Sequence, residues 1–148
     1  MSVWDKRGFD VNKILKEKHN MTITDQELNF IYNLGVKKCD VGDFTGAISL
    51  FQFLTLCKPA NALYIKATAG CFQNLEQYLQ AFVHYQTASF LDPKNNQDCF
   101  FFMAFCSLKL QENDRAKALF EQFLKGNPGH EFEKKAKLLL HGLQKTKP

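Results

Sequence analysis

The sequence predicts an all-α solenoid of three stacked helix-turn-helix repeats. Pro59, Pro93 and Pro128 follow one another at intervals of 34 and 35 residues. Each proline lies 12 residues after an alanine and 8 after an aromatic residue; the pairs are Ala47 with Phe51, Ala81 with Tyr85, and Ala116 with Phe120. A period of this length is typical of units that bury their apolar faces only by stacking on one another.

A closing proline, an Ala-x3-aromatic motif and a period near 34 residues are together typical of the tetratricopeptide repeat. We place three repeats within residues 25–129, at about 28–61, 62–95 and 97–130. An N-terminal segment and helix precede them over 1–24, and a capping helix with a basic tail follows over 130–148. One extra residue near Asn95 and Asn96 explains the longer second interval and is expected in a loop.

Composition narrows the class of protein. A chain of 148 residues favours one domain, and a net charge of +4 is too mild and too scattered to predict nucleic-acid binding. Five cysteines without a CxxC pair read as small buried residues of a reducing compartment. Because the N-terminus lacks the apolar core of a signal peptide and no apolar run reaches membrane-spanning length, we expect a soluble cytoplasmic protein.

The start of the chain predicts two helices. Val11, Ile14 and Leu15 recur at helical spacing, which indicates a helix over about 10–18 outside the repeats. Thr24 and Glu27 then have the spacing of a capping box, so the first helix of the first repeat is expected to begin there.

Single residues predict the turns and the close contacts. Gly35 is expected to let the partner helix approach, Gly42 to take a positive φ in the turn, and Asp43 to cap the next helix. Asn61 and Asn95 each follow a proline by two residues and are expected to cap the first helices of the second and third repeats.

Apolar residues at helical spacing predict the buried faces of the later helices. In the first helices of the second and third repeats they are Ile65, Thr68, Ala69 and Phe72, then Phe100, Met103, Ala104 and Ser107. The C-terminal helix is amphipathic, with Phe132, Ala136, Leu139, Leu140 and Leu143 on one face and a basic opposite face.

No pattern of residues predicts catalysis. The sequence contains no nucleophile-and-base motif, no glycine-rich phosphate loop and no HExxH, and its four histidines lie far apart. We therefore expect no enzyme activity, no metal site and no cofactor.

The first helices of such repeats line a concave groove, and a second stripe on each of them predicts a binding site. Its expected residues are Tyr32, Val36, Cys39, Leu63, Lys66, Gly70, Gln73, Phe101, Phe105 and Leu108. Phe101 and Phe105 are expected in the groove, whereas Phe102 is expected to be covered by a terminal helix. Repeats that grip acidic C-terminal tails carry Lys and Asn at the places of Tyr32 and Val36, so an apolar segment is the expected ligand.

Several motifs resemble one family of repeat proteins over about residues 10–125. They are Leu28-x2-Ile31-Tyr32-x-Leu34 followed by Gly42, Gly70-Cys71-x-Gln73 before Tyr78, Leu91-Asp92-Pro93, and Ala104-x-Cys106. The chain in these respects resembles the class II chaperones of bacterial type III secretion, the LcrH/SycD-like translocator chaperones. It departs from the family's usual residues at Cys39, Lys66, Phe102 and Phe105.

The resemblance implies a non-catalytic cytoplasmic chaperone that keeps hydrophobic translocator proteins soluble and unassembled before export. It implies binding of an extended apolar segment in the groove, and weak self-association through N-terminal residues; here the candidates are Trp4, Phe9, Val11, Ile14 and Leu15. The alternative is a generic repeat scaffold that assembles other proteins through its convex or terminal surfaces.

Overall fold

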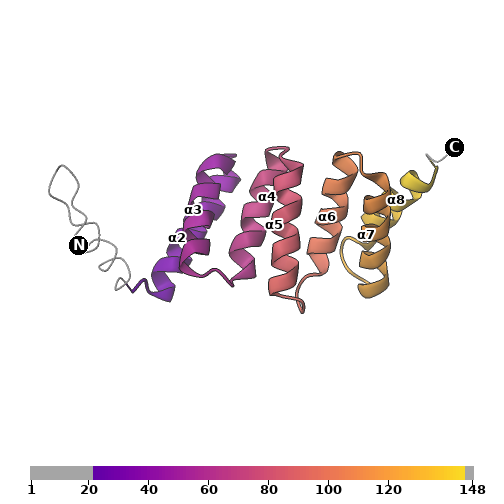
Figure 1. Ribbon diagram of the computed structural model, residues 1–148. Helices are drawn as coiled ribbons and strands as arrows, with labels where there is room; N and C mark the ends of the chain where they lie inside the picture. Colours follow the sequence, from indigo (N-terminus) through magenta and orange to yellow (C-terminus); the bar gives the residue numbers. More distant parts are fainter. Residues whose placement is uncertain (1–21, 146–148) are drawn as a thin grey trace, which may run out of the picture.

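The computed structural model describes residues 22–145 and confirms an all-α chain over that range. The helices are α2 (Asp25–Asp40), α3 (Phe44–Cys57), α4 (Ala62–Asn74), α5 (Tyr78–Leu91), α6 (Gln97–Lys109), α7 (Asn113–Gly126) and α8 (Glu133–Lys145). Each helix packs against its neighbours in the chain, so the helix pairs stand in a row from α2 and α3 to α7 and α8 (Figure 1). The helix expected over 10–18 lies outside the described residues.

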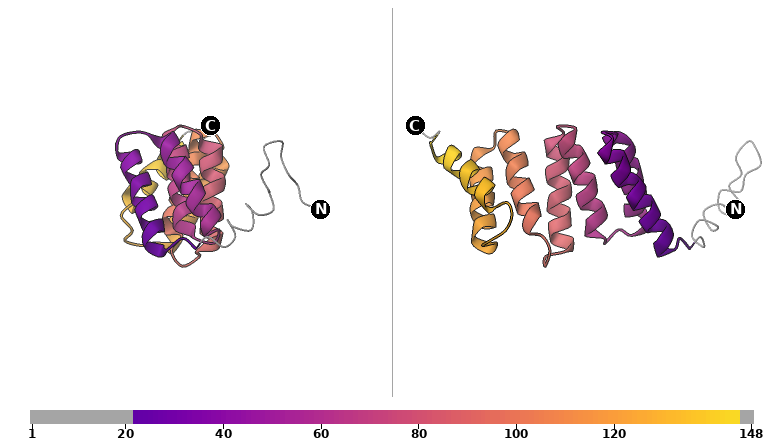
Figure 2. Two further views of the ribbon diagram at one scale, coloured as in Figure 1. Left: turned by 90° about the vertical axis from the view of Figure 1, so that its left-hand side faces the viewer. Right: turned by 180° about the vertical axis from the view of Figure 1, so that it is seen from behind.

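The ends of the row differ. Seen from behind in Figure 2, α8 lies across α7 at the opposite end of the molecule from α2. Ala136 and Leu143 of α8 are buried in one cluster with Phe120 and Phe123 of α7, as expected of a capping helix. Within residues 22–145, no helix combines the length and the apolar composition that crossing a bilayer requires.

Predicted side-chain caps hold the starts of α2, α3 and α4. Thr24 Oγ1 accepts from the Glu27 N–H at 3.1 Å, and the Thr24 N–H donates to the Glu27 carboxylate at 2.9 Å, which completes the capping box. Gly42 has a φ of 81°, and Asp43 Oδ1 accepts from the Gly46 N–H at 3.0 Å.

The two asparagine caps have different outcomes. Asn61 Oδ1 accepts from the Leu63 N–H at 3.0 Å, as predicted. The prediction for Asn95 is wrong, because α6 starts after Asn96 and Asn95 Nδ2 instead donates to the Asp92 carboxylate at 3.2 Å. The extra residue moves the asparagines by one place, so their side chains tie the loop back to α5.

A large ring beside a small residue forms the core of each repeat. Phe51, Tyr85 and Phe120 are all at most 3% exposed. In the first repeat Gly35 makes room for this ring: a Cβ built there would lie 2.5 Å from Phe51 Cε1. The predicted alanines Ala47, Ala81 and Ala116 are also fully buried. The recurring sequence motif therefore marks the contact between the two helices of each unit.

Gly35→Ala is expected to destabilise the fold. The added methyl group forces the Phe51 ring to move in a packed core, at a cost on the order of 1 to 3 kcal/mol. Urea unfolding followed by circular dichroism measures the change. Gly142→Ala in α8 is the matched control, because nothing lies within 4 Å of a Cβ built there. Since alanine is the better helix former, this substitution should raise the free energy of unfolding by about 0.5 to 1 kcal/mol. Equal effects at both positions would contradict the packing argument.

Stability is expected to fall above pH 9. Burial raises the pKa of the Cys71 and Cys106 thiols to about 12 and that of the Cys99 thiol to about 11, from an ordinary 9.0. Burial likewise raises the pKa of Tyr85. These groups are neutral in the folded protein. Their contribution to the free energy of unfolding is therefore complete below the pKa of the unfolded state, and it is lost as pH rises through the pKa of the folded state.

Urea titrations at intervals from pH 7 to pH 11 measure this decline. Cys106→Ala removes one buried thiol, so the variant should lose less stability per pH unit above pH 9 than the wild type. A stability that is constant to pH 11 would contradict the prediction.

Candidate functional site

The first helices of successive repeats, α2, α4 and α6, are joined by side-chain contacts along one surface of the row. Tyr32 of α2 meets Tyr64 of α4 with ring centroids 6.0 Å apart, and the Sγ atoms of Cys39 and Cys71 on the same two helices are 3.5 Å apart. We call this surface the first-helix face; among the predicted site residues it carries Tyr32, Val36, Cys39, Leu63, Lys66, Gly70, Gln73, Phe105 and Leu108.

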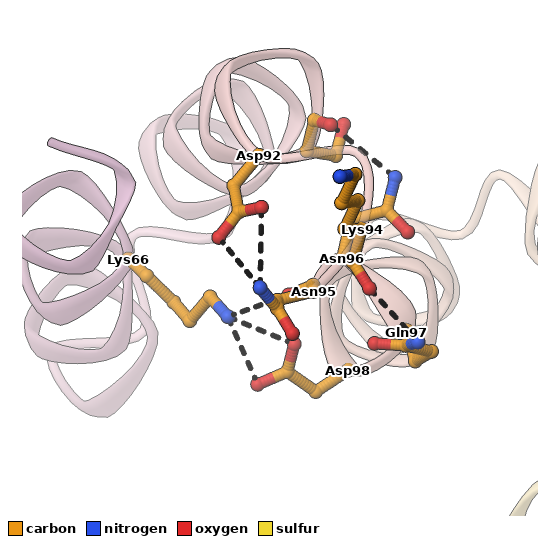
Figure 3. Close-up of polar contacts among 8 residues, drawn as sticks. Lys66, Asp92, Lys94, Asn95, Asn96, Gln97 and Asp98 are labelled. Carbon is orange, nitrogen blue, oxygen red and sulfur yellow. Dashed lines mark hydrogen bonds and ion pairs between the residues drawn. The ribbon is translucent and has the colours of Figure 1, made fainter. Parts of the chain in front are cut away.

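An ion pair joins α4 to α6 on the first-helix face. Lys66 Nζ lies 3.0 Å from Asp98 Oδ1 and also donates to the Asn95 carbonyl oxygen at 3.2 Å. Figure 3 shows the Lys66 side chain reaching across from α4 to this carboxylate, with Asn95 turned toward Asp92. The Lys66 and Asp98 side chains are 26% and 32% exposed, so the pair is partly buried.

Phe101 is the main correction to the predicted groove. We expected its ring in the groove, but it is only 2% exposed and stacks on Phe132 at a centroid distance of 4.6 Å. Its ring also meets Phe120 and Phe123 of α7. The reason is the solenoid itself: the place of Phe101 in α6 is that of Tyr32 in α2, and this place packs against the next unit.

Phe102 and Phe105 lie nearer to their predicted places than Phe101 does. Phe102 is half-buried and contacts Phe132, the residue before α8, as expected for covering by the C-terminal segment. It also stacks on Tyr85 of α5, at 5.1 Å between ring centroids. Phe105 is also half-buried, with Tyr78 at its edge and Lys109 Nζ 5.6 Å from its ring centroid. Part of the Phe105 ring therefore remains open on the first-helix face.

The other predicted residues leave apolar surface open. Leu63 is 50% exposed and Val36 is 37% exposed, while Leu108 and Gly70 are half-buried. A Cβ at Gly70 would meet only the Tyr85 hydroxyl, at 3.8 Å, so the backbone of α4 is accessible there.

The hydroxyl of Tyr85 ties a core ring to the first-helix face. It donates to Gln73 Oε1 at 2.8 Å, which satisfies the one polar atom of a side chain that is only 3% exposed. Gln73 is thereby held in place by the core. Its amide nitrogen is left as a hydrogen-bond donor, because this bond uses only the amide oxygen.

This surface has the chemistry of binding. It combines apolar side chains, one ion pair and an amide, and among residues 22–145 no group of three metal-ligating side chains comes together. The predicted self-association residues Trp4, Phe9, Val11, Ile14 and Leu15 lie outside the described residues.

Sequence reasoning missed two residues, Asp98 and Phe132. Asp98 occupies in α6 the place of Asn29 in α2 and Leu63 in α4, so extending the predicted stripe by one turn would have found it. The sequence predicts Phe132 on the apolar face of the capping helix. Nothing in the spacing showed that it stacks on Phe101 ahead of α8.

Comparisons place this arrangement among known proteins. PcrH from Pseudomonas aeruginosa, solved in complex with the chaperone binding region of PopD, superposes with a TM-score of 0.77 at 25% identity, over 87% of this chain and 99% of PcrH. The chain has the fold of the type III secretion translocator chaperones. The Yersinia enterocolitica chaperone SycD, in complex with a peptide of the translocator YopD, has a TM-score of 0.79 at 20% identity, over 86% of this chain and all of SycD (100%).

These neighbours confirm the resemblance and the tetratricopeptide fold predicted above. The first repeat domain of Spaghetti (RPAP3), bound to the HSP90 peptide SRMEEVD, shares the fold with a TM-score of 0.73 at 17% identity, over 85% of this chain and 97% of that domain. No protein-family model matches the sequence, and the search of curated proteins returned no match.

Lys66→Met is expected to destabilise the junction between α4 and α6. The substitution leaves the Asp98 carboxylate without its cation in a partly buried place, at a cost on the order of 1 kcal/mol. Urea unfolding of Lys66→Met, Asp98→Leu and the double variant measures the coupling, and the double variant should recover part of the loss.

Lys137→Met is the control for removing a lysine. It breaks the i,i+4 pair with Glu133 in α8, in which the lysine side chain is 62% exposed, and should leave the unfolding midpoint unchanged. Additive effects of Lys66→Met and Asp98→Leu would show that the ion pair does not couple the two helices.

Proposed function

We propose that this protein is a cytoplasmic, non-catalytic chaperone of a type III secretion system. It binds hydrophobic translocator proteins on its first-helix face and keeps them soluble and unassembled before export. One observation carries the proposal: PcrH and SycD, which match nearly the whole chain, were solved with translocator segments bound.

The exposed chemistry supports the same ligand. Val36 and Leu63 present open apolar surface from α2 and α4, and Phe105 and Leu108 continue it on α6. An extended segment places alternate side chains on one side, so several apolar anchors can contact successive repeats at once. Covering such a segment favours the soluble bound state by mass action.

The Lys66–Asp98 pair supplies a polar position within this apolar surface. Its two charges satisfy each other, so the pair can hydrogen-bond the backbone of a bound segment without demanding a charged client. We infer that a client is apolar on both sides of this position.

The proposed ligand differs from the peptide bound to the Spaghetti (RPAP3) domain. SRMEEVD carries carboxylates at its end, whereas the first-helix face offers Tyr32 and Val36 where acidic-tail binders carry Lys and Asn. The one lysine among the predicted site residues, Lys66, is already paired with Asp98. An acidic peptide is therefore a poor match for this surface.

Translocator binding is tested with purified protein and the chaperone binding region of PopD as the probe. Leu63→Ala and Phe105→Ala should each weaken binding by on the order of 1 to 2 kcal/mol, which is a loss of roughly 5- to 30-fold in affinity. Isothermal titration calorimetry measures the change. Phe101→Ala is unsuitable, since that ring belongs to the core.

Leu56→Ala on α3 and Phe90→Ala on α5 are the matched controls. Both side chains are apolar and highly exposed, at 81% and 76%, but they lie on the second helices of their repeats. Their variants should bind the probe as the wild type does. In cells, co-expression should keep a membrane-active secreted partner in the soluble fraction, and an insoluble partner would remove the proposal's main support.

A generic repeat scaffold is the second candidate. The exposed apolar side chains of Leu56 on α3 and Phe90 on α5 favour the scaffold, because they offer a partner a contact outside the first-helix face. The same four variants separate the two candidates: a scaffold would lose its partner with Leu56→Ala or Phe90→Ala and keep it with Leu63→Ala and Phe105→Ala.

Weak self-association through Trp4, Phe9, Val11, Ile14 and Leu15 belongs to the same proposal. Light scattering of the full chain and of a variant beginning at residue 22 tests it. The full chain should show a concentration-dependent rise in mass that the shortened chain lacks.

A further inference from the structure

Two thiols from different helices meet at the junction of the first two repeats. Cys39 lies in the last turn of α2 and Cys71 in the last turns of α4, and their Sγ atoms are 3.5 Å apart, which is van der Waals contact. The rings of Tyr32 and Tyr64 join the same two helices beside them. Both cysteines are free thiols, so two oxidisable atoms are already held next to each other.

The two thiols differ in their access to solvent. Cys39 is half-buried, whereas Cys71 is 2% exposed and burial raises its pKa to about 12. A dissolved oxidant therefore reaches Cys39 first. Cys71 Sγ is already in contact with the Cys39 sulfur, so it is placed to react second once its proton is removed.

We propose that Cys39 and Cys71 are a modification site at which a hydroperoxide forms a reversible disulfide between α2 and α4. The Cys39 sulfur attacks the peroxide and the O–O bond breaks; Cys39 becomes a sulfenic acid, and its proton goes to the departing oxygen. The Cys71 sulfur then attacks Cys39 Sγ. The S–S bond forms, the S–O bond breaks, and the hydroxyl leaves as water with the Cys71 proton.

The remaining cysteines are poorly placed for this chemistry. Cys99 and Cys106 lie seven residues apart on α6, so about 10 Å of helix separates their backbones, too far for a disulfide. Cys57 stands at the last residue of α3, and the one sulfur–sulfur contact among the described residues joins Cys39 to Cys71 instead. The structure thus selects one pair among the five cysteines.

The bond would act on the fold and on the first-helix face. It closes a loop between positions 32 residues apart, which restricts the unfolded chain and should raise the urea midpoint. It also fixes the spacing between α2 and α4, from which Tyr32, Val36 and Leu63 are presented.

The test uses the full, reduced chain and hydrogen peroxide. After treatment, the protein is unfolded in an alkylating reagent and its intact mass is measured. The reduced chain should take up five alkyl groups and the oxidised chain three, without a covalent dimer. Dithiothreitol should restore all five.

Variants assign the bond. Cys39 and Cys57 lie in one tryptic fragment, so a peptide mass alone does not tell which of them is bonded. Lys58 is the only Lys or Arg between Cys39 and Lys66, and trypsin does not cut there because Pro59 follows. Cys57→Ser is therefore the matched control, and it should still lose two thiols and gain in urea midpoint. Cys39→Ser should do neither. Cys71→Ala, with its fold checked by circular dichroism, should leave Cys39 as a sulfenic acid that a dimedone probe traps.

Three results would overturn the proposal. One is retention of all five thiols by the folded wild type at peroxide concentrations that oxidise the urea-unfolded chain. Another is an oxidised Cys39→Ser protein that loses two thiols as the wild type does. The third is a disulfide between two chains in place of the intramolecular bond.

Discussion

The contact between the two helices of each repeat supports everything else in this structure. Phe51, Tyr85 and Phe120 are buried, and each stands four residues after a buried alanine of the same second helix. In the first repeat this ring lies so close to Gly35 that no side chain fits between them. Because interiors are close-packed, a ring in this place sets how closely the partner helix can approach. The first helix is thereby held with its opposite side outward.

Stacking of these units creates a surface that no single unit contains. Tyr32 reaches Tyr64, Lys66 reaches Asp98, and Phe101 reaches Phe132, so one place in each first helix always meets the next unit. The kind of contact differs between the three repeats: two rings meet at Tyr32, an ion pair forms at Lys66, and Phe101 is part of a buried aromatic stack. The polar position in the middle and the sealed end at α8 follow from these three residue choices.

The fold was predictable from the sequence because its signals are local and repeated. Thr24 with Glu27, Gly42 and Asp43 act within a few residues of themselves, and the structure has each as expected. Asn95 shows where local reasoning fails. Its spacing from Pro93 matches that of Asn61 from Pro59, but the extra residue makes Asp92 the better partner for its amide.

By itself the sequence determined the all-α class, the three repeats, the caps at Thr24, Asp43 and Asn61, and the residues that share a face, since period and capping are properties of the chain. Only the tertiary structure decided which of those residues stay open. Phe101 and Phe105 stand one turn apart on the same side of α6, yet Phe132 covers the first and leaves part of the second exposed. Likewise, Cys39 and Cys71 became neighbours only through packing of α2 on α4. Helical spacing gives the direction of a side chain, whereas burial depends on what another segment places over it.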